Sequence, residues 1–131
     1  MDNGRVITFH RGSSQGSGLN LLIDGPGGWS AYAHDGSTGS SIFTSSYPET
    51  NRWYYLAVTH DGTTHKFWVD MDLIGTQSRG FSLGSFTAMI GHYNNLTSIY
   101  AWDGWIAGIR VTNRAKSEAE LENYFYGMRG Y

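Results

Sequence analysis

The sequence predicts an all-β protein that carries one short helix near its C-terminus. Glycine makes up 18 of the 131 residues, about twice its usual share, and falls between short runs rich in Val, Ile, Thr, Phe, Tyr and Trp. The clearest of these runs, Trp53 to His60, alternates between two faces with a period of two residues. Only one segment, Ser117 to Tyr126, has apolar residues at helical spacing. Short strands joined by tight turns are the consequence.

The size and charge of the chain limit what it can be. It has 131 residues and a mass of 14.6 kDa, so we expect residues 1–131 to form a single domain. The formal net charge is -2, and the basic residues form no block. This charge pattern argues against binding to the phosphate backbone of a nucleic acid.

The absence of cysteine excludes several chemistries at once, namely disulfide bonds, a thiolate nucleophile and cysteine-based zinc sites. The start of the chain lacks the basic and apolar regions of a secretion signal, so we expect no signal peptide in this chain. No apolar run approaches the ~20 residues that a membrane-spanning helix needs. We therefore expect no membrane insertion.

The first half of the sequence is expected to form four short strands. Glycine-rich or proline-containing turns separate them, for example from Arg11 to Gly18 and from Asp24 to Gly28. A longer polar loop, Ser45 to Arg52, follows the fourth strand. The expected strands are Arg5 to His10, Leu19 to Asp24, Trp29 to His34 and Ser41 to Thr44.

An antiparallel hairpin is expected at the centre of the chain. In its first strand, Trp53 to His60, the even-numbered residues from Tyr54 to Val58 are apolar or aromatic and share one face. An Asp61-Gly62 turn leads to the second strand, Lys66 to Asp70. There Trp68 takes the face opposite to its two apolar neighbours.

Three further strands are expected before the helix. Two are short, Leu73 to Thr76 and Thr87 to Gly91, and residues 92–102 are expected to form a loop. The last strand is Trp105 to Thr112, whose apolar residues are spaced three and then two apart. A bulge near Ala107-Gly108 would place them on one face.

The segment from Ser117 to Tyr126 is expected to be the helix. Ser117 can cap its first turn, and Glu120 stands three residues further on, as in a capping box. Leu121, Tyr124 and Phe125 fall on one side of it. One short terminal helix on a sheet protein is the consequence.

Two stretches of the sequence resemble the laminin G-like domains of the concanavalin A-like lectin and glucanase superfamily. The first is the central hairpin, WYYLAVTHDG at 53–62 and KFWVD at 66–70, which is similar to a family hairpin of the form W-x-x-hydrophobic-A-V-T-x-D-G. The second combines Ile90-Gly91, DGWIAGIRVTNRA at 103–115 and the helix from Ser117, and is similar to the family's closing strand and short helix. The resemblance covers roughly residues 52–124 and implies a two-sheet antiparallel β-sandwich of the jelly-roll type.

The sequence also departs from this family in ways that affect function. Family domains usually open with two or three more strands before the one that Arg5 to His10 matches, and these strands are missing here. An open sheet exposes backbone groups that another chain can cover, so a homo-oligomer or a larger assembly is expected. Ala107-Gly108 stands where acidic residues are common in the family, and Met71 where glycine is. The sequence therefore supports no calcium site, and we expect no cofactor.

The acidic residues and histidines do not form a catalytic pattern. The superfamily's glucanases use two carboxylates on one strand, about 5 Å apart. Here the four glutamates lie in a loop and on the helix, at Glu49, Glu118, Glu120 and Glu122. His60, Asp61 and His65 surround one turn, and we interpret them as ordinary hairpin residues because three ligands at a turn make an incomplete metal site. We therefore expect no catalytic residue, no metal ligand and no enzymatic activity.

Aromatic residues near amides and carboxylates are the candidate binding residues. If the apolar face of the central hairpin packs inward, Tyr55 and Trp68 point outward, where a ring can stack on a sugar. The alternative is that the terminal helix, missing strands or a partner chain covers them. A second group lies in the loop after residue 92. The candidate carbohydrate-binding residues are Tyr55, Trp68, Tyr93, Asn94, Asn95, Trp102 and Asp103.

Two functions from different classes fit these patterns. One is a lectin-like recognition module without enzymatic activity, which binds glycan or protein within a larger extracellular or virion structure. The other is a structural subunit, such as a virion decoration, capsid or tail component, whose open sheet is completed by neighbouring chains. Both place the protein in a virion or at a cell surface.

Overall fold

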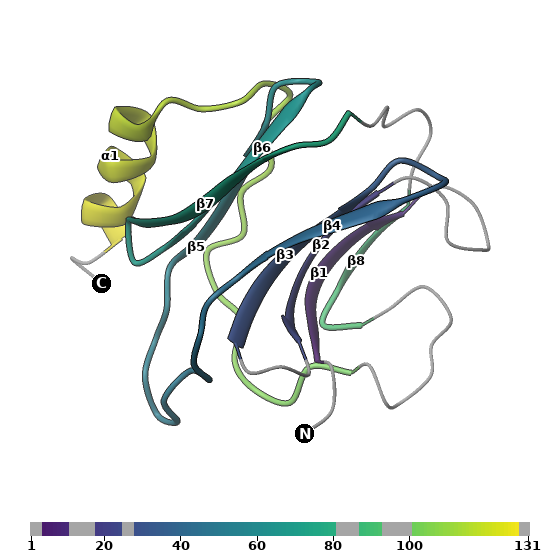
Figure 1. Ribbon diagram of the computed structural model, residues 1–131. Helices are drawn as coiled ribbons and strands as arrows, with labels where there is room; N and C mark the ends of the chain where they lie inside the picture. The colour runs from purple at the N-terminus through teal and green to yellow at the C-terminus, as the bar shows by residue number, and fades with distance from the viewer. Residues whose placement is uncertain (1–3, 11–17, 25–27, 81–86, 93–100, 129–131) are drawn as a thin grey trace.

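The computed structural model describes residues 4–10, 18–24, 28–80, 87–92 and 101–128. Two antiparallel sheets face each other, and one short helix packs on the outer side of the smaller sheet (Figure 1). The predicted all-β sandwich with a C-terminal helix is confirmed. Its elements are β1 (Arg5–His10), β2 (Gly18–Asp24), β3 (Gly28–His34), β4 (Gly39–Phe43), β5 (Leu56–His60), β6 (Thr64–Val69), β7 (Asp72–Ser78), β8 (Thr87–Ile90) and α1 (Glu118–Met128).

Five strands form the larger sheet, in the order β4-β3-β2-β1-β8. The first four strands pair antiparallel with their neighbours in the chain, and β8 returns to pair with the other side of β1. The register places Ile7, Leu21, Ala31 and Ile42 opposite one another in a row across four strands. These four side chains are all buried, so this row marks the inner face of the sheet.

Three strands form the smaller sheet, in the order β5-β6-β7. The predicted central hairpin is confirmed, because Val58 of β5 lies opposite Phe67 of β6. β6 and β7 are joined by a tight turn in which Asp70 and Met71 have φ values of 51° and 73°. Positive φ at both central residues is what a two-residue hairpin turn that follows the strand twist requires.

The hydrophobic core lies between the two sheets. Phe67 and Val69 of β6 pack against the row Ile7–Leu21–Ala31–Ile42, and Phe67 is fully buried. Burying a side chain of this size contributes about 1.5–3 kcal/mol. Gly75 of β7 lets the sheets approach, since a Cβ there would stand 2.7 Å from Cγ2 of Ile42.

Helix α1 covers the outer face of the smaller sheet. The predicted capping box is present, because the Ser117 N–H donates to the Glu120 carboxylate at 2.9 Å and the Glu120 N–H donates to Ser117 Oγ at 3.3 Å. Leu121 packs on Ala57 and Trp68, so the predicted apolar side of the helix is the side that is buried. No helix among the described residues is long and apolar enough to cross a membrane.

The two sheets are joined along one long edge, where β4 lies beside β7 (Figure 1). Gln77 Nε2 donates a hydrogen bond to the Ser41 carbonyl oxygen at 3.0 Å. Arg79 Nη1 donates to Asp35 Oδ2 at the same distance, 3.0 Å. We call this side of the sandwich, defined by Asp35, Ser41, Gln77 and Arg79, the closed edge.

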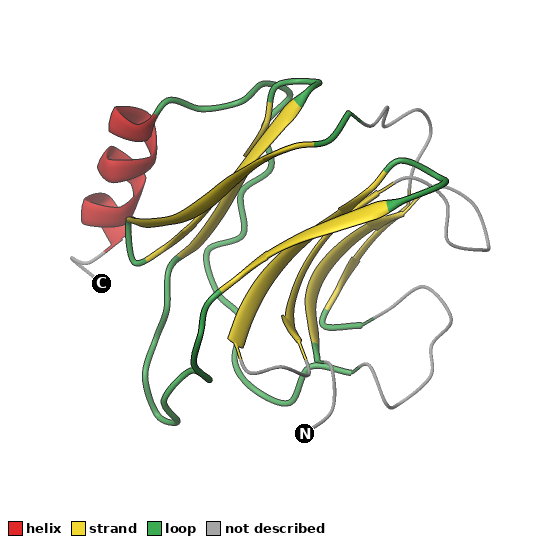
Figure 2. Ribbon diagram, viewed as in Figure 1, coloured by secondary structure: helices red, strands yellow, loops and turns green. Residues whose placement is uncertain are grey.

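The prediction of a last strand at residues 105–112 is wrong. Residues 103–113 pass from the larger sheet to α1 without joining either sheet (Figure 2). No described residue shares a backbone hydrogen bond with them. A strand-forming sequence becomes a strand only when a neighbouring strand pairs with its backbone. In the described part of the chain that neighbour is missing, and Gly108, with a φ of 65°, departs from strand geometry.

Candidate functional site

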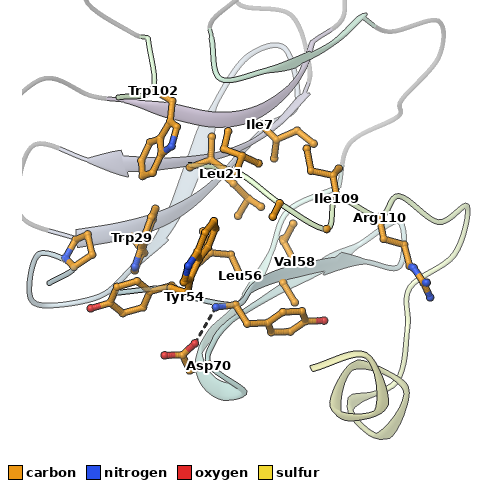
Figure 3. A pocket seen from close by; sticks show the side chains of 18 of the residues that line it. Ile7, Leu21, Trp29, Tyr54, Leu56, Val58, Asp70, Trp102, Ile109 and Arg110 are labelled. Carbon is orange, nitrogen blue, oxygen red and sulfur yellow. Dashed lines mark hydrogen bonds between the residues drawn. The ribbon is translucent and has the colours of Figure 1, made fainter. Parts of the chain in front are cut away.

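A groove opens between the sheets on the side opposite the closed edge. Its volume of about 2550 Å³ exceeds the roughly 300–1,000 Å³ of typical small-molecule sites. Strands β1 and β2 form one wall, β5 forms the other, and residues 101–116 run along the groove. In Figure 3, Ile7 and Leu21 face Leu56 and Val58 across this space, with Ile109 beside them. The two facing walls are therefore apolar.

One edge of β5, at the groove, has no partner among the described strands. β5 pairs with β6 and with no other described strand. The Tyr55 carbonyl accepts from the Asp70 N–H at 2.8 Å, so the backbone of this odd-numbered residue faces β6. Backbone groups alternate sides along an antiparallel strand, so those of Leu56 and Val58 point away from β6. We call this edge, at Leu56 and Val58, the free edge of β5.

The segment 103–113 lines the same groove with exposed apolar side chains. Trp105 is 87% exposed and Val111 61% exposed, and Ile109 is also exposed. These side chains belong to the strand-like sequence that no described strand pairs with. Exposed apolar groups that cluster in this way mark interaction surfaces.

Both ends of the segment 103–113 are held in place. At the start, the Trp102 N–H donates to the Gly91 carbonyl at 2.8 Å. At the other end, Arg114 Nη1 donates to Glu120 Oε2 at 2.9 Å. This guanidinium and the Ser117 N–H hold the pKa of the Glu120 carboxyl well below its usual range. The segment is therefore anchored at its ends while its middle has no backbone partner among the described residues.

Aromatic rings gather at one end of the groove (Figure 3). Trp29 stacks on Trp102 with ring centroids 5.5 Å apart, and meets Tyr54 edge-on at 5.6 Å. The Arg52 guanidinium lies 4.5 Å from the centre of the Tyr54 ring and pairs with Asp70 at 2.7 Å. Because these groups bind one another, this end of the groove is a packed support for the loop before β5.

Two of the predicted carbohydrate-binding residues lie beneath α1. Both Tyr55 and Trp68 point to the outer face of the smaller sheet, as the alternation predicts. However, Trp68 is only 3% exposed, because it packs with Leu121 of the helix. The Tyr55 ring is half-buried, 5.3 Å from the ring of Phe125. The helix therefore covers Trp68, which is the alternative that the sequence left open, and no sugar can stack on this ring while the helix is in place. Tyr55 keeps part of its surface exposed.

The other predicted residues lie elsewhere. Trp102 is half-buried at the groove, and Asp103 beside it is exposed. Trp102 packs against the core between the sheets, whereas Trp68 belongs to the cluster beneath α1, so the structure does not bring these two rings together. Tyr93, Asn94 and Asn95 lie outside the described residues.

The groove itself was not predicted as a site. Leu56 and Val58 have the sequence pattern of ordinary core residues, and they line a groove because no strand covers them. The available signal was the strong strand pattern at residues 105–112. This pattern does not show where the unpaired segment runs.

The polar residues of the described part do not build a metal site. No group of three or more His, Asp or Glu side chains there could hold a metal ion. Glu118 and Glu122 are exposed on the helix, and Glu120 caps it. What the groove offers chemically is apolar surface and unpaired backbone groups.

Comparison with known families agrees with this architecture. A laminin G family model, described as the concanavalin A-like lectin/glucanases superfamily, matches residues 2–122. This chain belongs to that superfamily. The match extends the resemblance seen in the sequence to the first strand.

One solved structure resembles this concanavalin A-like domain, an S-layer domain-containing protein from Clostridium thermocellum. The two chains are 19% identical, with a TM-score of 0.53, and the match covers 93% of this chain and 63% of the other. The chain therefore spans less than two thirds of that structure, and at this identity the likeness concerns the fold alone. No curated protein sequence matches the chain.

Proposed function

We propose that this domain is a non-enzymatic assembly module of a cell-surface or extracellular structure, and that its groove binds an extended strand from a second copy of the chain. The observation that carries the proposal is the free edge of β5 beside an apolar groove. An unpaired edge of this kind is a template for another strand. In this proposal the incoming strand supplies both the missing hydrogen bonds and the apolar side chains that fill the groove.

A polypeptide strand fits the groove better than a small ligand does. The volume of about 2550 Å³ exceeds what small-molecule sites offer. Strand addition obtains affinity from main-chain hydrogen bonds and specificity from alternate side chains. The backbone groups of Leu56 and Val58 would supply the hydrogen bonds, and the apolar lining of the groove would receive the alternate side chains.

A second copy is the favoured source because the chain carries a matching donor. The segment 103–113 includes Trp105, Ile109 and Val111, residue types that favour strands, and all three are exposed. Donor and acceptor on one chain allow a two-fold symmetric exchange, in which each copy gives its segment and receives the other's. We propose that this exchange converts the segment 103–113 into the strand that its sequence predicts.

The location rests on the family and on the structural neighbour. That neighbour is an S-layer domain-containing protein, which supports a place in a cell-surface structure. The superfamily also supports a binding role without catalysis. A virion structure would use the same assembly chemistry, and no feature of the groove favours it.

Light scattering across a concentration series tests the proposal. We expect the wild-type chain to reach twice its single-chain mass of 14.6 kDa, with a melting temperature that rises with concentration. Val58→Pro removes one N–H of the free edge and leaves the β6 side of the strand paired. Val111→Lys puts a charge on the donor. Both variants should remain single chains at every concentration.

A matched variant separates this mechanism from a general charge effect. Asn113→Lys adds the same charge at an exposed position at the end of the donor segment and should still form the dimer. A wild-type chain that stays monomeric at all concentrations would refute the proposal. Dimers that persist in both Val58→Pro and Val111→Lys would refute the assigned interface.

Carbohydrate binding is a second proposal, for Trp102 and Asp103 together with the loop residues Tyr93, Asn94 and Asn95. The supporting observation is an exposed carboxylate next to a half-buried indole, since sugars use rings for stacking and carboxylates for their hydroxyls. Glycan-array binding of the wild type that Asp103→Ala removes, at an unchanged melting temperature, would support this second role. Absence of glycan binding by the wild type would reject it.

A further inference from the structure

Two turns at one end of the sandwich share a five-residue pattern. The sequence His-Asp-Gly-Ser-Thr at 34–38 joins β3 to β4, and His-Asp-Gly-Thr-Thr at 60–64 joins β5 to β6. In both turns the aspartate Oδ1 accepts from the backbone N–H groups two and three residues further on, at 2.9 Å and 2.8 Å. Each turn belongs to a different sheet, so the two sheets end in the same local structure.

Arg79, which follows β7, connects these two turns. Its guanidinium donates to Asp35 Oδ2 at 3.0 Å and to Thr38 Oγ1 in the first turn. Its backbone N–H donates to the Thr63 carbonyl at 2.8 Å in the second turn. In Figure 1 the end of β7 lies between the β5–β6 turn at the top and the β3–β4 turn at the right.

The hydrogen bonds at both turns require neutral histidines. The Gly36 N–H donates to His34 Nδ1 at 3.0 Å, and the Gly62 N–H donates to His60 Nδ1 at 2.9 Å. A ring nitrogen that accepts a hydrogen bond carries no proton. His60 Nε2 lies 2.7 Å from the Arg79 carbonyl oxygen, which can only accept, so this nitrogen carries the ring's single proton. Protonation of either Nδ1 atom would therefore break a turn hydrogen bond.

A third histidine is buried at the same place. His65 of β6 lies opposite His60 in the ladder, with ring centroids 6.4 Å apart, and it is fully buried. Neither of its ring nitrogens has a hydrogen-bond partner among the described residues. A charge at such a site would be neither solvated nor paired.

The surroundings of His65 oppose protonation further. His60 faces it from β5 and Arg79 faces it from the end of β7, while Asp35 of the first turn is already paired with Arg79. Lys66, the next residue on β6, is exposed on the opposite face of the strand. Burial lowers the pKa of His65, and the charges of His60 and Arg79 lower it further.

We propose that His34, His60, His65 and Arg79 form an acid-sensitive clasp between the two sheets. At neutral pH the three uncharged rings allow Arg79 to hold both turns. As the pH falls, burial and the neighbouring Arg79 oppose protonation of His65, so the folded state loses stability relative to the unfolded chain and this end of the sandwich is released. The clasp is a property of the closed edge and does not depend on what fills the groove.

The sign of the expected pH effect follows from proton linkage. A histidine whose folded-state pKa is lowered stabilises the fold above its unfolded pKa of about 6.5, and this stability is lost as the pH falls. One such histidine, fully blocked from protonation in the folded state, raises the unfolding equilibrium constant about 30-fold between pH 7.5 and pH 5. Carboxylates of unfolded chains titrate near pH 4, so they contribute little in this window.

Urea unfolding at one protein concentration, repeated from pH 7.5 to pH 5, tests the clasp. We expect the unfolding constant of the wild type to rise, by up to about 30-fold from His65. His65→Phe keeps a buried ring but removes the titrating group, so most of this rise should disappear. His92→Gln, a histidine replacement away from the clasp, should keep the wild-type pH dependence. An unchanged wild-type constant, or an equal pH dependence in His65→Phe, would overturn the proposal.

A second measurement on the wild type keeps the proposal testable if His65→Phe does not fold. In an NMR titration, the amide signals of Gly36 and Gly62 report the hydrogen bonds to the two Nδ1 atoms. We expect both signals to shift and lose protection between pH 7 and pH 5. Signals that stay constant through this range would contradict the clasp. Neither measurement depends on dimer formation, so its failure is distinct from failure of the assembly proposal.

Discussion

The two long sides of the sandwich differ in how completely their groups are paired. At the closed edge, Gln77 and Arg79 of the smaller sheet bond to Ser41 and Asp35 of the larger one. At the groove, the free edge of β5 and the segment 103–113 have no strand partner among the described residues. Among the described residues, hydrogen bonds therefore join the two sheets along one side of the sandwich, and no strand pairing closes the other side.

The two sides differ in whether residues close in the sequence or distant ones determine their structure. The closed edge is built from short local patterns, since the two His-Asp-Gly turns make their own hydrogen bonds within five residues. The groove side has no such local hydrogen bonds among the described residues, and we propose that a strand from a second copy supplies them. The sequence therefore specifies the closed edge locally, whereas in our proposal the groove side is completed by a partner.

The largest expected effect compares the shared core with the groove wall. Phe67→Ala should lower the free energy of unfolding by about 3–5 kcal/mol, because it removes a fully buried ring from between the sheets. Leu56→Ala, at the half-buried groove wall, should cost only about 1 kcal/mol in the single chain. Urea unfolding of dilute samples measures both. Equal costs would mean that the groove is closed.

The next effect concerns Trp68, the residue on the opposite face of the smaller sheet. Trp68→Ala should lower the free energy of unfolding by about 3 kcal/mol, because it leaves a cavity under Leu121. Loss of helical signal in circular dichroism at lower temperature than the sheet signal would show that the helix detaches first. A variant with unchanged stability would contradict the placement of Trp68 beneath α1.

A smaller effect on stability is expected from the carboxyl groups of the two turns, Asp35 and Asp61. Hydrogen bonds from the Thr63 and Thr64 N–H groups lower the pKa of Asp61 to about 2, and equivalent bonds lower the pKa of Asp35 further. Such carboxylates stabilise the fold above about pH 4, and this stability is lost as the pH falls toward 2.

Asp35→Ala and Asp61→Ala form the matched pair for this test. Both should lower the melting temperature at pH 6 and flatten its decline between pH 4 and pH 2. Asp35→Ala should have the larger effect because it also releases Arg79. Equal melting temperatures for the two variants would argue that the contact between Arg79 and Asp35 does not join the sheets.

The smallest effect is expected at the β6–β7 turn. Met71 has a φ of 73°, which strains a residue with a side chain, yet this side chain packs against the cluster beneath α1. Met71→Ala loses the packing and keeps the strain, whereas Met71→Gly loses the packing and relieves the strain. Met71→Gly should therefore be more stable than Met71→Ala by about 1 kcal/mol. The reverse order in thermal melts would contradict the turn geometry.

Most of the fold could be predicted from local sequence patterns. Eight strands lie where the glycine-bounded β-branched runs predict them, with ends that differ by at most three residues. Ser117 and Glu120 mark the start of the helix because a capping box depends only on residues close in the chain. The face of the hairpin that packs inward also followed from alternation, since Val58 and Phe67 point to the core.

The site could not be predicted in the same way, because it depends on which strands meet. The sequence of residues 105–112 favours a strand, but pairing needs a neighbour that local patterns do not reveal. The outward direction of Trp68 followed from alternation, while its cover by Leu121 depends on where the helix docks. The paired histidine turns were visible as a repeated pattern, yet their link through Arg79 appears only in three dimensions.

Amide hydrogen exchange at the free edge of β5 tests the central claim most directly. If a second copy supplies a strand, the N–H groups of Leu56, Val58, Ile109 and Val111 should be protected at high protein concentration and lose protection on dilution. The odd-numbered amides of β5 that bond β6 should stay protected throughout. Rapid exchange of Leu56 and Val58 at every concentration would contradict the proposal that this groove is completed by another copy of the chain.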